Sequence, residues 1–255
     1  METPKRTIEP GTPQPNEKYK IDIMPRGPYL VYGNPPLQQK ILTPNKEQIP
    51  WTYTDGKTHP TNHEPTALCR CGHSQNHPYC DGSHAHAEWD STLTADNTPL
   101  LENAESYDGP TVRLEDNLKY CVHARICMAK KSVWKLTFRS NDPKARDAAI
   151  HESTLCPSGR LKLWDKQKEA FIEPPFRPAL GLIEDPQEKC SGPLWVQGGI
   201  PINGPEGILY EQRNRVTLCR CGSSLNKPFC DGSHLKTGFN DRLPLKKMGV
   251  EESPS

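Results

Sequence analysis

One cysteine- and histidine-rich pattern occurs twice in the chain, at residues 69–84 and 219–234, and both stretches read Cys-x-Cys-x8-Cys-x3-His. The first two cysteines are two positions apart, so in an extended segment their side chains leave the same side. The third cysteine and the histidine are four positions apart, so one helical turn places them on one face. We therefore expect four side chains to converge on a metal centre in each stretch: Cys69, Cys71, Cys80 and His84 in the first, and Cys219, Cys221, Cys230 and His234 in the second.

The composition indicates why such centres are needed for stability. Only 33% of the 255 residues are hydrophobic and 27 are prolines, so we do not expect one large apolar core. Small domains with little core depend on metals, disulfides or oligomerisation. The composition therefore predicts small, metal-stabilised domains. The short β-prone stretches and short predicted helices of the chain make the expected fold α+β and β-rich.

The cysteines and the charge also restrict the compartment and the partners. Ten cysteines without a secretion signal favour metal binding in a reducing compartment over a disulfide framework, and we expect a cytoplasmic protein. A formal net charge of +1 gives no reason to expect nucleic acid or a membrane surface as a partner. The chain also lacks the run of about eighteen apolar residues that a membrane span requires.

A second pair of matching stretches precedes the cysteine patterns. These are GPYLVYGNPPL from Gly27 and GPLWVQGGIPI from Gly192, each typical of a short strand followed by a turn. The repeated unit is therefore a small domain. The first copy is roughly 15 residues longer, which we assign to a surface loop within 43–60. The predicted organisation is a disordered tail (1–26), a first domain (27–95), a different middle domain (110–175), a second copy (190–243) and a C-terminal tail (244–255), joined by irregular proline-punctuated linkers.

The ligand types alone leave two metals open. Zinc takes three cysteines and a histidine readily in tetrahedral structural sites. A 2Fe–2S cluster normally takes four cysteines, with histidine replacing some of them in a minority of proteins. The Cys-x-Cys spacing is an awkward match to the usual zinc knuckles, which favours iron–sulfur without excluding zinc.

Both stretches resemble the signature of the CDGSH iron–sulfur family, C-x-C-x2-(S/T)-x3-P-x-C-D-G-(S/A/T)-H. The matching positions are Cys69, Cys71, Ser74, Pro78, Cys80, Asp81, Gly82, Ser83 and His84 in the first copy, and Cys219, Cys221, Ser224, Pro228, Cys230, Asp231, Gly232, Ser233 and His234 in the second. The resemblance implies one 2Fe–2S cluster per copy, held by three cysteines and one histidine beside a small β-rich cap. Members of this family form homodimers, so two copies in one chain resemble that dimer fused end to end and predict a monomer with paired repeats.

The middle segment carries three further cysteines. A ferredoxin run is C-x2-C-x2-C followed by Cys-Pro. Cys121 and Cys127 occupy its first and third positions, Ala124 stands in the second, and Cys156 supplies the last. β-prone stretches at 111–121 and 160–172 flank a short predicted helix at 142–153. The segment thus resembles the divergent single-cluster, ferredoxin-like domain often joined to CDGSH domains.

The missing second cysteine determines which cluster the middle segment could bind. Three thiolates suit a 3Fe–4S cluster, whereas a 4Fe–4S cluster needs another ligand, for which His123 is the nearest candidate. The alternative is a segment that binds no cluster and simply buries its cysteines. Cys190 lies apart from this set in the sequence and is predicted to be a free thiol.

These features predict an iron–sulfur protein with up to three clusters. Electron transfer with a redox partner is the first hypothesis, and cluster donation to an apo-acceptor or iron/redox sensing is the second. A zinc-binding interaction scaffold is the third. The sequence shows no phosphate loop, nucleophile elbow or HExxH run, so we assign no catalytic residues and do not expect an enzyme.

Overall fold

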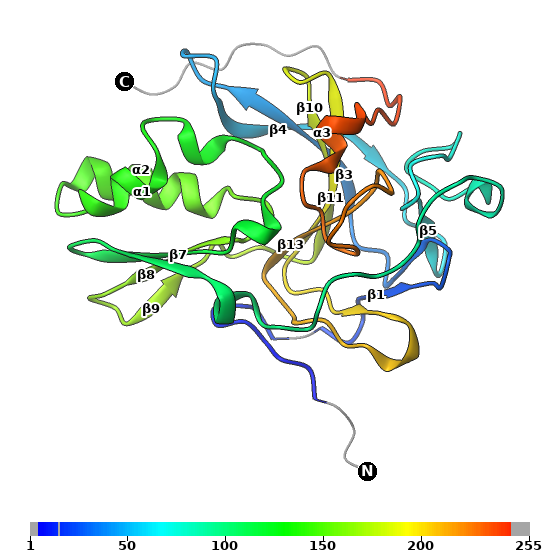
Figure 1. The fold of residues 1–255 in the computed structure, drawn as a ribbon, viewed down its shortest axis with the longest axis horizontal. Coiled ribbons are helices and arrows are strands. Elements are labelled where there is room, and N and C mark those ends of the chain that lie inside the picture. Colours follow the sequence, from blue (N-terminus) through cyan, green and yellow to red (C-terminus); the bar gives the residue numbers. More distant parts are fainter. Residues whose placement is uncertain (1–4, 15, 246–255) are drawn as a thin grey trace.

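The computed structural model describes residues 5–14 and 16–245, whose strands form three sheets. Figure 1 shows the helices within residues 133–154 at the left, beside the central strands. The first sheet has the strand order β12-β1-β2-β5. Its strands are Ile202–Asn203 (β12), Lys20–Ile23 (β1), Tyr29–Tyr32 (β2) and Thr66–Leu68 (β5). β1 and β2 alternate strictly between buried and half-buried residues, as expected for strands with one face on a core.

The second sheet has the strand order β13-β11-β10-β3-β4. Its strands are Arg215–Leu218 (β13), Cys190–Gln197 (β11), Ala179–Asp185 (β10), Leu37–Pro44 (β3) and Pro50–His59 (β4). Every residue of β11 is buried, because the sheet is covered on both faces at this position.

The two repeats exchange one strand each. β3, which follows β2 in the first repeat, pairs in parallel with β10 of the second, with Leu37 opposite Leu180. β12, which follows β11 in the second repeat, pairs in parallel with β1 of the first, with Ile202 opposite Ile21. Side chains from both repeats consequently form one hydrophobic core. The two repeats therefore share both sheets and one core, and they do not form two separate domains.

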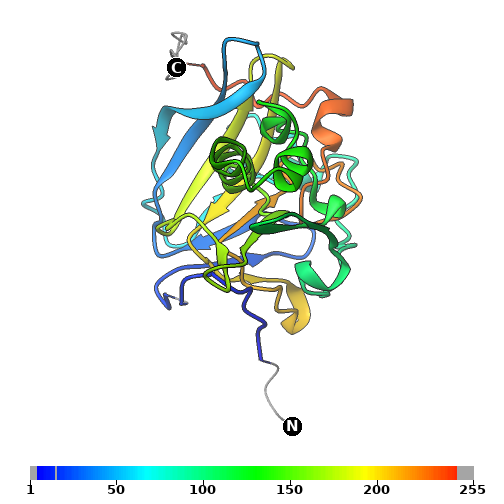
Figure 2. The ribbon, with the colours of Figure 1, turned by 90° about the vertical axis from the view of Figure 1, so that its left-hand side faces the viewer.

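The middle segment forms its own layer beside this pair of sheets (Figure 2). A four-stranded sheet runs in the order β6-β7-β8-β9, formed by Glu105–Asp108, Val112–Asp116, Leu161–Asp165 and Ala170–Ile172. Two helices, Val133–Phe138 (α1) and Pro143–Thr154 (α2), pack on it, and each begins after a capping side chain, Ser132 and Asp142 respectively.

The remaining helical segments are short. One is α-helical, Ser233–Thr237 (α3), and the others are 3₁₀ turns: Ser83–Ala85 (η1), Leu100–Asn103 (η2), Leu118–Tyr120 (η3), Ile126–Met128 (η4) and Pro205–Gly207 (η5). The fold is therefore α+β with small sheets and few helices. Within residues 5–14 and 16–245, no helix is both long enough and apolar enough to cross a membrane.

The structure differs from the sequence-based prediction in three segments. The predicted disordered tail at 1–26 contains β1, whose Ile21 and Ile23 are buried, and Glu9 is buried in an ion pair with Lys162. The predicted surface loop at 43–60 is largely the β3–β4 hairpin. The predicted irregular linker before Cys190 contains β10, which pairs with β11 as β1 pairs with β2 and therefore belongs to the second repeat. Most of the predicted C-terminal tail (246–255), and residues 1–4 and 15 of the N-terminal one, lie outside the described residues.

Candidate metal centres

The first repeat brings its four predicted ligands together as two pairs. Cys69 and Cys71 follow β5, and their sulfur atoms are 3.6 Å apart. Cys80 precedes η1 and His84 belongs to it, with 3.3 Å between Cys80 Sγ and His84 Nδ1. Residues two apart in an extended segment lie on the same side, and so do residues four apart in a helical turn. The two pairs therefore form as their spacing predicts.

The second repeat reproduces this geometry. Cys219 and Cys221 follow β13 with their sulfur atoms 3.7 Å apart. Cys230 Sγ lies 3.4 Å from His234 Nδ1, and His234 belongs to α3. The two sites therefore have equivalent donors in equivalent places.

The loop of each site is shaped by the same hydrogen bonds. In the first, Ser74 Oγ donates to the carbonyl of Tyr79 (2.7 Å), and Asp81 accepts from the backbone N–H groups of Gln75 (2.7 Å) and Ser83 (3.0 Å). The hydroxyl of Ser83, together with these backbone bonds, lowers the pKa of Asp81 well below its usual range, since hydrogen bonds favour the carboxylate. Ser224 and Asp231 make the corresponding bonds in the second loop.

An arginine between the paired cysteines anchors each site, and it is not among the site residues predicted from the sequence. Arg70 Nε donates to the carbonyl of Gly27 at 2.6 Å, and Arg220 Nε donates to the carbonyl of Gly192 at 2.8 Å. Both arginines are buried. The recurrence of Cys-Arg-Cys after each Gly-Pro stretch was the available signal, because each arginine connects the two repeated stretches.

The thiol pairs share their protons unequally. The hydrogen bond from Cys71 lowers the pKa of Cys69, while the same bond raises the pKa of Cys71. In the second site the hydrogen bond from Cys221 likewise lowers the pKa of Cys219, while the pKa of Cys221 is raised. Each pair therefore gives up its first proton readily, and binding of a metal would displace the second.

Burial distinguishes the histidine ends of the two sites. Cys230 and His234 are 2% and 4% exposed. Cys80 and His84 are only half-buried. Burial, together with Arg220, lowers the pKa of His234 to about 4, which keeps its imidazole in the neutral, metal-binding form.

The two sites meet through their backbones. Cys71 and Cys221 form an antiparallel β-bridge. The next residue in each copy is a glycine with positive φ, Gly72 and Gly222. A Cβ atom on Gly72 would lie 2.6 Å from the carbonyl oxygen of Cys221, and one on Gly222 would overlap that of Cys71. Only glycine therefore fits this crossing.

The three cysteines of the middle segment line one cavity of about 180 Å³. Cys121 and Cys127 come from the loop around η4, and Cys156 from the turn after α2. Burial raises the pKa of Cys121, and burial together with Cys156 raises that of Cys127 to about 12. Cys190, predicted to be a free thiol, is buried at the start of β11 and does not line this cavity.

Arg160 and His123 also line the cavity. Arg160 is 3% exposed and forms an ion pair with Asp116. Its guanidinium places a positive charge near three thiols, which would stabilise them as thiolates. Arg160 is not among the site residues predicted from the sequence, although it lies only four positions after Cys156.

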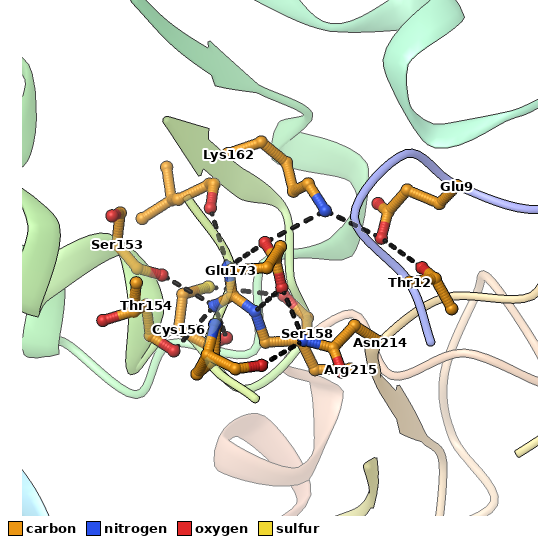
Figure 3. Close-up of polar contacts among 12 residues, drawn as sticks. Glu9, Thr12, Ser153, Thr154, Cys156, Ser158, Lys162, Glu173, Asn214 and Arg215 are labelled. Carbon is orange, nitrogen blue, oxygen red and sulfur yellow. Dashed lines mark hydrogen bonds and ion pairs between the residues drawn. The ribbon is translucent and has the colours of Figure 1, made fainter. Parts of the chain in front are cut away.

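Arg215 of β13 fixes the turn that carries Cys156 (Figure 3). The side chain is 1% exposed and donates to the carbonyls of Ser153 (2.7 Å), Thr154 (2.9 Å) and Cys156 (2.7 Å). Its counterion is Glu173, at 2.8 Å. Although burial opposes ionisation of Glu173, the charges of Arg215 and Lys162 lower its pKa to about 2. A strand of the second repeat thereby positions a cysteine of the middle segment.

The donors are of the kind that iron–sulfur clusters and zinc accept, neutral imidazole and thiolate. In the part of the chain that the structure describes, no three Cys, His, Asp or Glu side chains are grouped tightly enough for one metal ion. Each repeat instead offers two donor pairs, so it could bind one metal at the thiol pair and another at the Cys–His pair.

Family models match most of the region that contains these sites. The model described as iron-binding zinc finger CDGSH type matches residues 26–85 and 191–235. The model described as divergent 4Fe-4S mono-cluster matches residues 107–166. No curated protein and no solved structure matches the chain.

Proposed function

Because the chain is an iron–sulfur protein with two CDGSH-type domains flanking a divergent 4Fe-4S mono-cluster domain, we propose that it transfers electrons with three clusters. The ligands of the first 2Fe–2S cluster would be Cys69, Cys71, Cys80 and His84. Those of the second would be Cys219, Cys221, Cys230 and His234. Cys121, Cys127 and Cys156 would hold a 3Fe–4S or 4Fe–4S cluster in the middle domain.

The arrangement of donors in pairs is the observation that supports two irons per repeat. A single zinc ion needs four ligands around one point. In a 2Fe–2S cluster each iron takes two protein ligands, and one thiol pair plus one Cys–His pair supplies them. The second repeat offers the same two pairs.

The middle cavity supports a larger cluster. Three thiols from two segments surround it, which is the number that a three-iron cluster requires. A fourth iron would need a further donor from the cavity lining, where His123 is the nearest imidazole. Arg160 would offset part of the negative charge of the thiolates and the cluster.

The proximity of the three sites favours electron transfer. An iron–sulfur cluster takes up and releases single electrons over a wide range of potentials. The ligand residues Cys71 and Cys221 are bridge partners, and the carbonyl oxygen of Cys121 would lie 3.3 Å from a Cβ atom on Gly232. The backbone of each ligand set thus contacts that of another, within one chain.

Cluster donation is the second candidate function, and the exposure of the first site supports it. His84 and Cys80 are half-buried, so an acceptor protein could reach the cluster at this end. A carrier keeps its clusters through repeated cycles of reduction and oxidation. A donor transfers iron and sulfide to an apo-acceptor, and this difference separates the two functions.

Iron and acid-labile sulfide per chain, measured with EPR on anaerobically purified protein, test the proposal. Three clusters correspond to about seven or eight irons. An EPR signal from the oxidised protein would assign a three-iron cluster to the middle domain, and C127S should remove it. Colourless protein that contains zinc and no sulfide would contradict the proposal.

A further inference from the structure

Two equivalent glycines have different surroundings. Gly82 and Gly232 occupy the same position between the third cysteine and the histidine, and both have φ of 88°. Among the residues that the structure describes, none lies within 4 Å of a Cβ atom built on Gly82. A Cβ atom on Gly232 would overlap His123 Cδ2 and lie 3.1 Å from His123 Nε2. The imidazole of the middle domain therefore rests on the second site and has no counterpart at the first.

The loop that carries His123 is held in this place. His123 itself has φ of 55°, so the backbone turns sharply at the contact. Two residues later, Arg125 makes a bidentate ion pair with Asp185 of β10, with N–O distances of 2.8 and 3.0 Å. Since the Asp185 side chain is only 5% exposed, this pair fastens the middle domain to a strand of the second repeat.

The covered end of the second site is its Cys–His pair. Cys230 and His234 are almost fully buried, whereas the equivalent Cys80 and His84 are half-buried. A groove of about 550 Å³, lined by His63, Asn76 and Tyr79, also reaches Cys80. The thiol pairs do not show the same difference in burial: Cys221 of the second site is half-buried, whereas Cys71 of the first site is buried. The asymmetry is thus specific to the end with the neutral ligand, which is the easier one to displace.

We propose that His123 is a positioning residue that closes the Cys–His end of the second site, so that the two repeats divide their roles. The second site retains its cluster inside the protein, and the first site is the one at which a cluster or its iron is exchanged with an outside acceptor. This inference rests on the proposed iron–sulfur function, but it concerns the access to each site and not its occupancy.

Cluster loss to a ferrous chelator tests the inference. Reduced holoprotein is mixed with bathophenanthroline disulfonate, and both the iron–chelator complex and the bleaching of the visible absorbance are followed. We expect two phases from the CDGSH-type sites, with the second site at least about tenfold slower. H84C should change only the fast phase and H234C only the slow one, which assigns them.

Variants on both sides of the contact provide the decisive comparison. H123A removes the imidazole that lies against the second site, and the added methyl group of G232A displaces that imidazole. Both variants should accelerate the slow phase by about tenfold. G82A is the matched control, because it imposes the same backbone strain at φ of 88° without a neighbour to displace. It should leave the slow phase unchanged.

The outcomes are separable from those of the proposed function. Protein without labile sulfide would refute the iron–sulfur proposal itself. Protein with both clusters that loses them in a single phase would overturn only the division of roles. So would equal effects of G82A and G232A on the slow phase, or a slow phase that H123A does not change.

Discussion

The hydroxyl of Tyr29 donates a 2.8 Å hydrogen bond to the backbone carbonyl of Cys219, which lies 190 residues further along the chain. A strand of the first repeat thus supports the first ligand of the second site. Tyr29 is 1% exposed and also approaches the carbonyl of Pro228 at 3.3 Å. Leu194 stands at the equivalent position of the second repeat, so the support runs in one direction.

Loss of this hydroxyl should weaken the second site. Y29F leaves a buried carbonyl without its donor, which should lower the free energy of unfolding by about 1–2 kcal/mol. Denaturant titrations followed by visible absorbance and by tryptophan fluorescence measure the effect. Y32F is the control, because Tyr32 lies on the same strand and keeps its ring contact with Lys20. Equal midpoints for the two variants would contradict the prediction.

Alanine at the crossing of the repeats should destabilise both sites together. G72A places a methyl group against the carbonyl of Cys221 and should cost several kcal/mol, of which about 1–2 kcal/mol is the positive-φ penalty alone. G207A is the control, because Gly207 has φ of 81° and open space around its Cβ position. Iron content and thermal unfolding midpoints compare them. If G207A lost as much iron and thermal stability as G72A, the close approach of Gly72 to Cys221 would not be the cause of the destabilisation.

Arg215 should be required for the middle site more than for the two repeat sites. R215M removes the donor to three carbonyls around Cys156 and leaves Glu173 buried with one cation fewer, which should cost about 3–5 kcal/mol. We expect selective loss of the middle cluster, seen as fewer irons per chain and loss of its EPR signal. R146K, which keeps the ion pair of Arg146 with Asp165 on the same domain, should retain that cluster.

Glu152 should give the protein a pH-dependent stability. Burial raises its pKa to about 7, and its carboxylate accepts a 2.8 Å hydrogen bond from the backbone of Lys130. Because the pKa in the unfolded chain is near 4.5, the folded state binds more protons between these values. Stability from this group is therefore present below pH 4.5 and lost as the pH rises to 7.

The variant E152Q should remove this dependence. Near pH 8 it should be more stable than the wild type by about 1–3 kcal/mol, and near pH 5 the difference should shrink. Urea midpoints of both proteins at the two pH values measure it. E102Q, at an exposed position, should have the same urea midpoint as the wild type at both pH values. A constant difference between E152Q and wild type would contradict the assignment.

Short-range patterns were sufficient to recognise the family and to pair the donors. The Cys-x-Cys and Cys-x3-His spacings predict which side chains share a face, because these relations span two to four residues. The tandem CDGSH-type organisation, with a divergent cluster domain between the copies, was confirmed by the family matches. The helix predicted at 142–153 lies within one residue of α2 at both ends.

Long-range pairings could not be predicted from these patterns. β3 lies between the Gly-Pro stretch and the cysteine pattern of the first repeat, and its partner β10 lies in a segment predicted to be an irregular linker. The contact of His123 with Gly232 joins segments about one hundred residues apart that share no sequence signal. The β3–β10 pairing and the His123–Gly232 contact both depend on how domains pack. Hydrophobic periodicity and motif spacing do not predict such packing.

The reciprocal exchange of β3 and β12 has a consequence for dilute solutions. When strands cross between separate subunits, their pairing weakens as the protein is diluted. Here a covalent tether keeps the local concentration of each strand constant, so the joined sheets should persist at any abundance in the cell. The same tether lets the two halves diverge in their loops while the crossing strands stay matched.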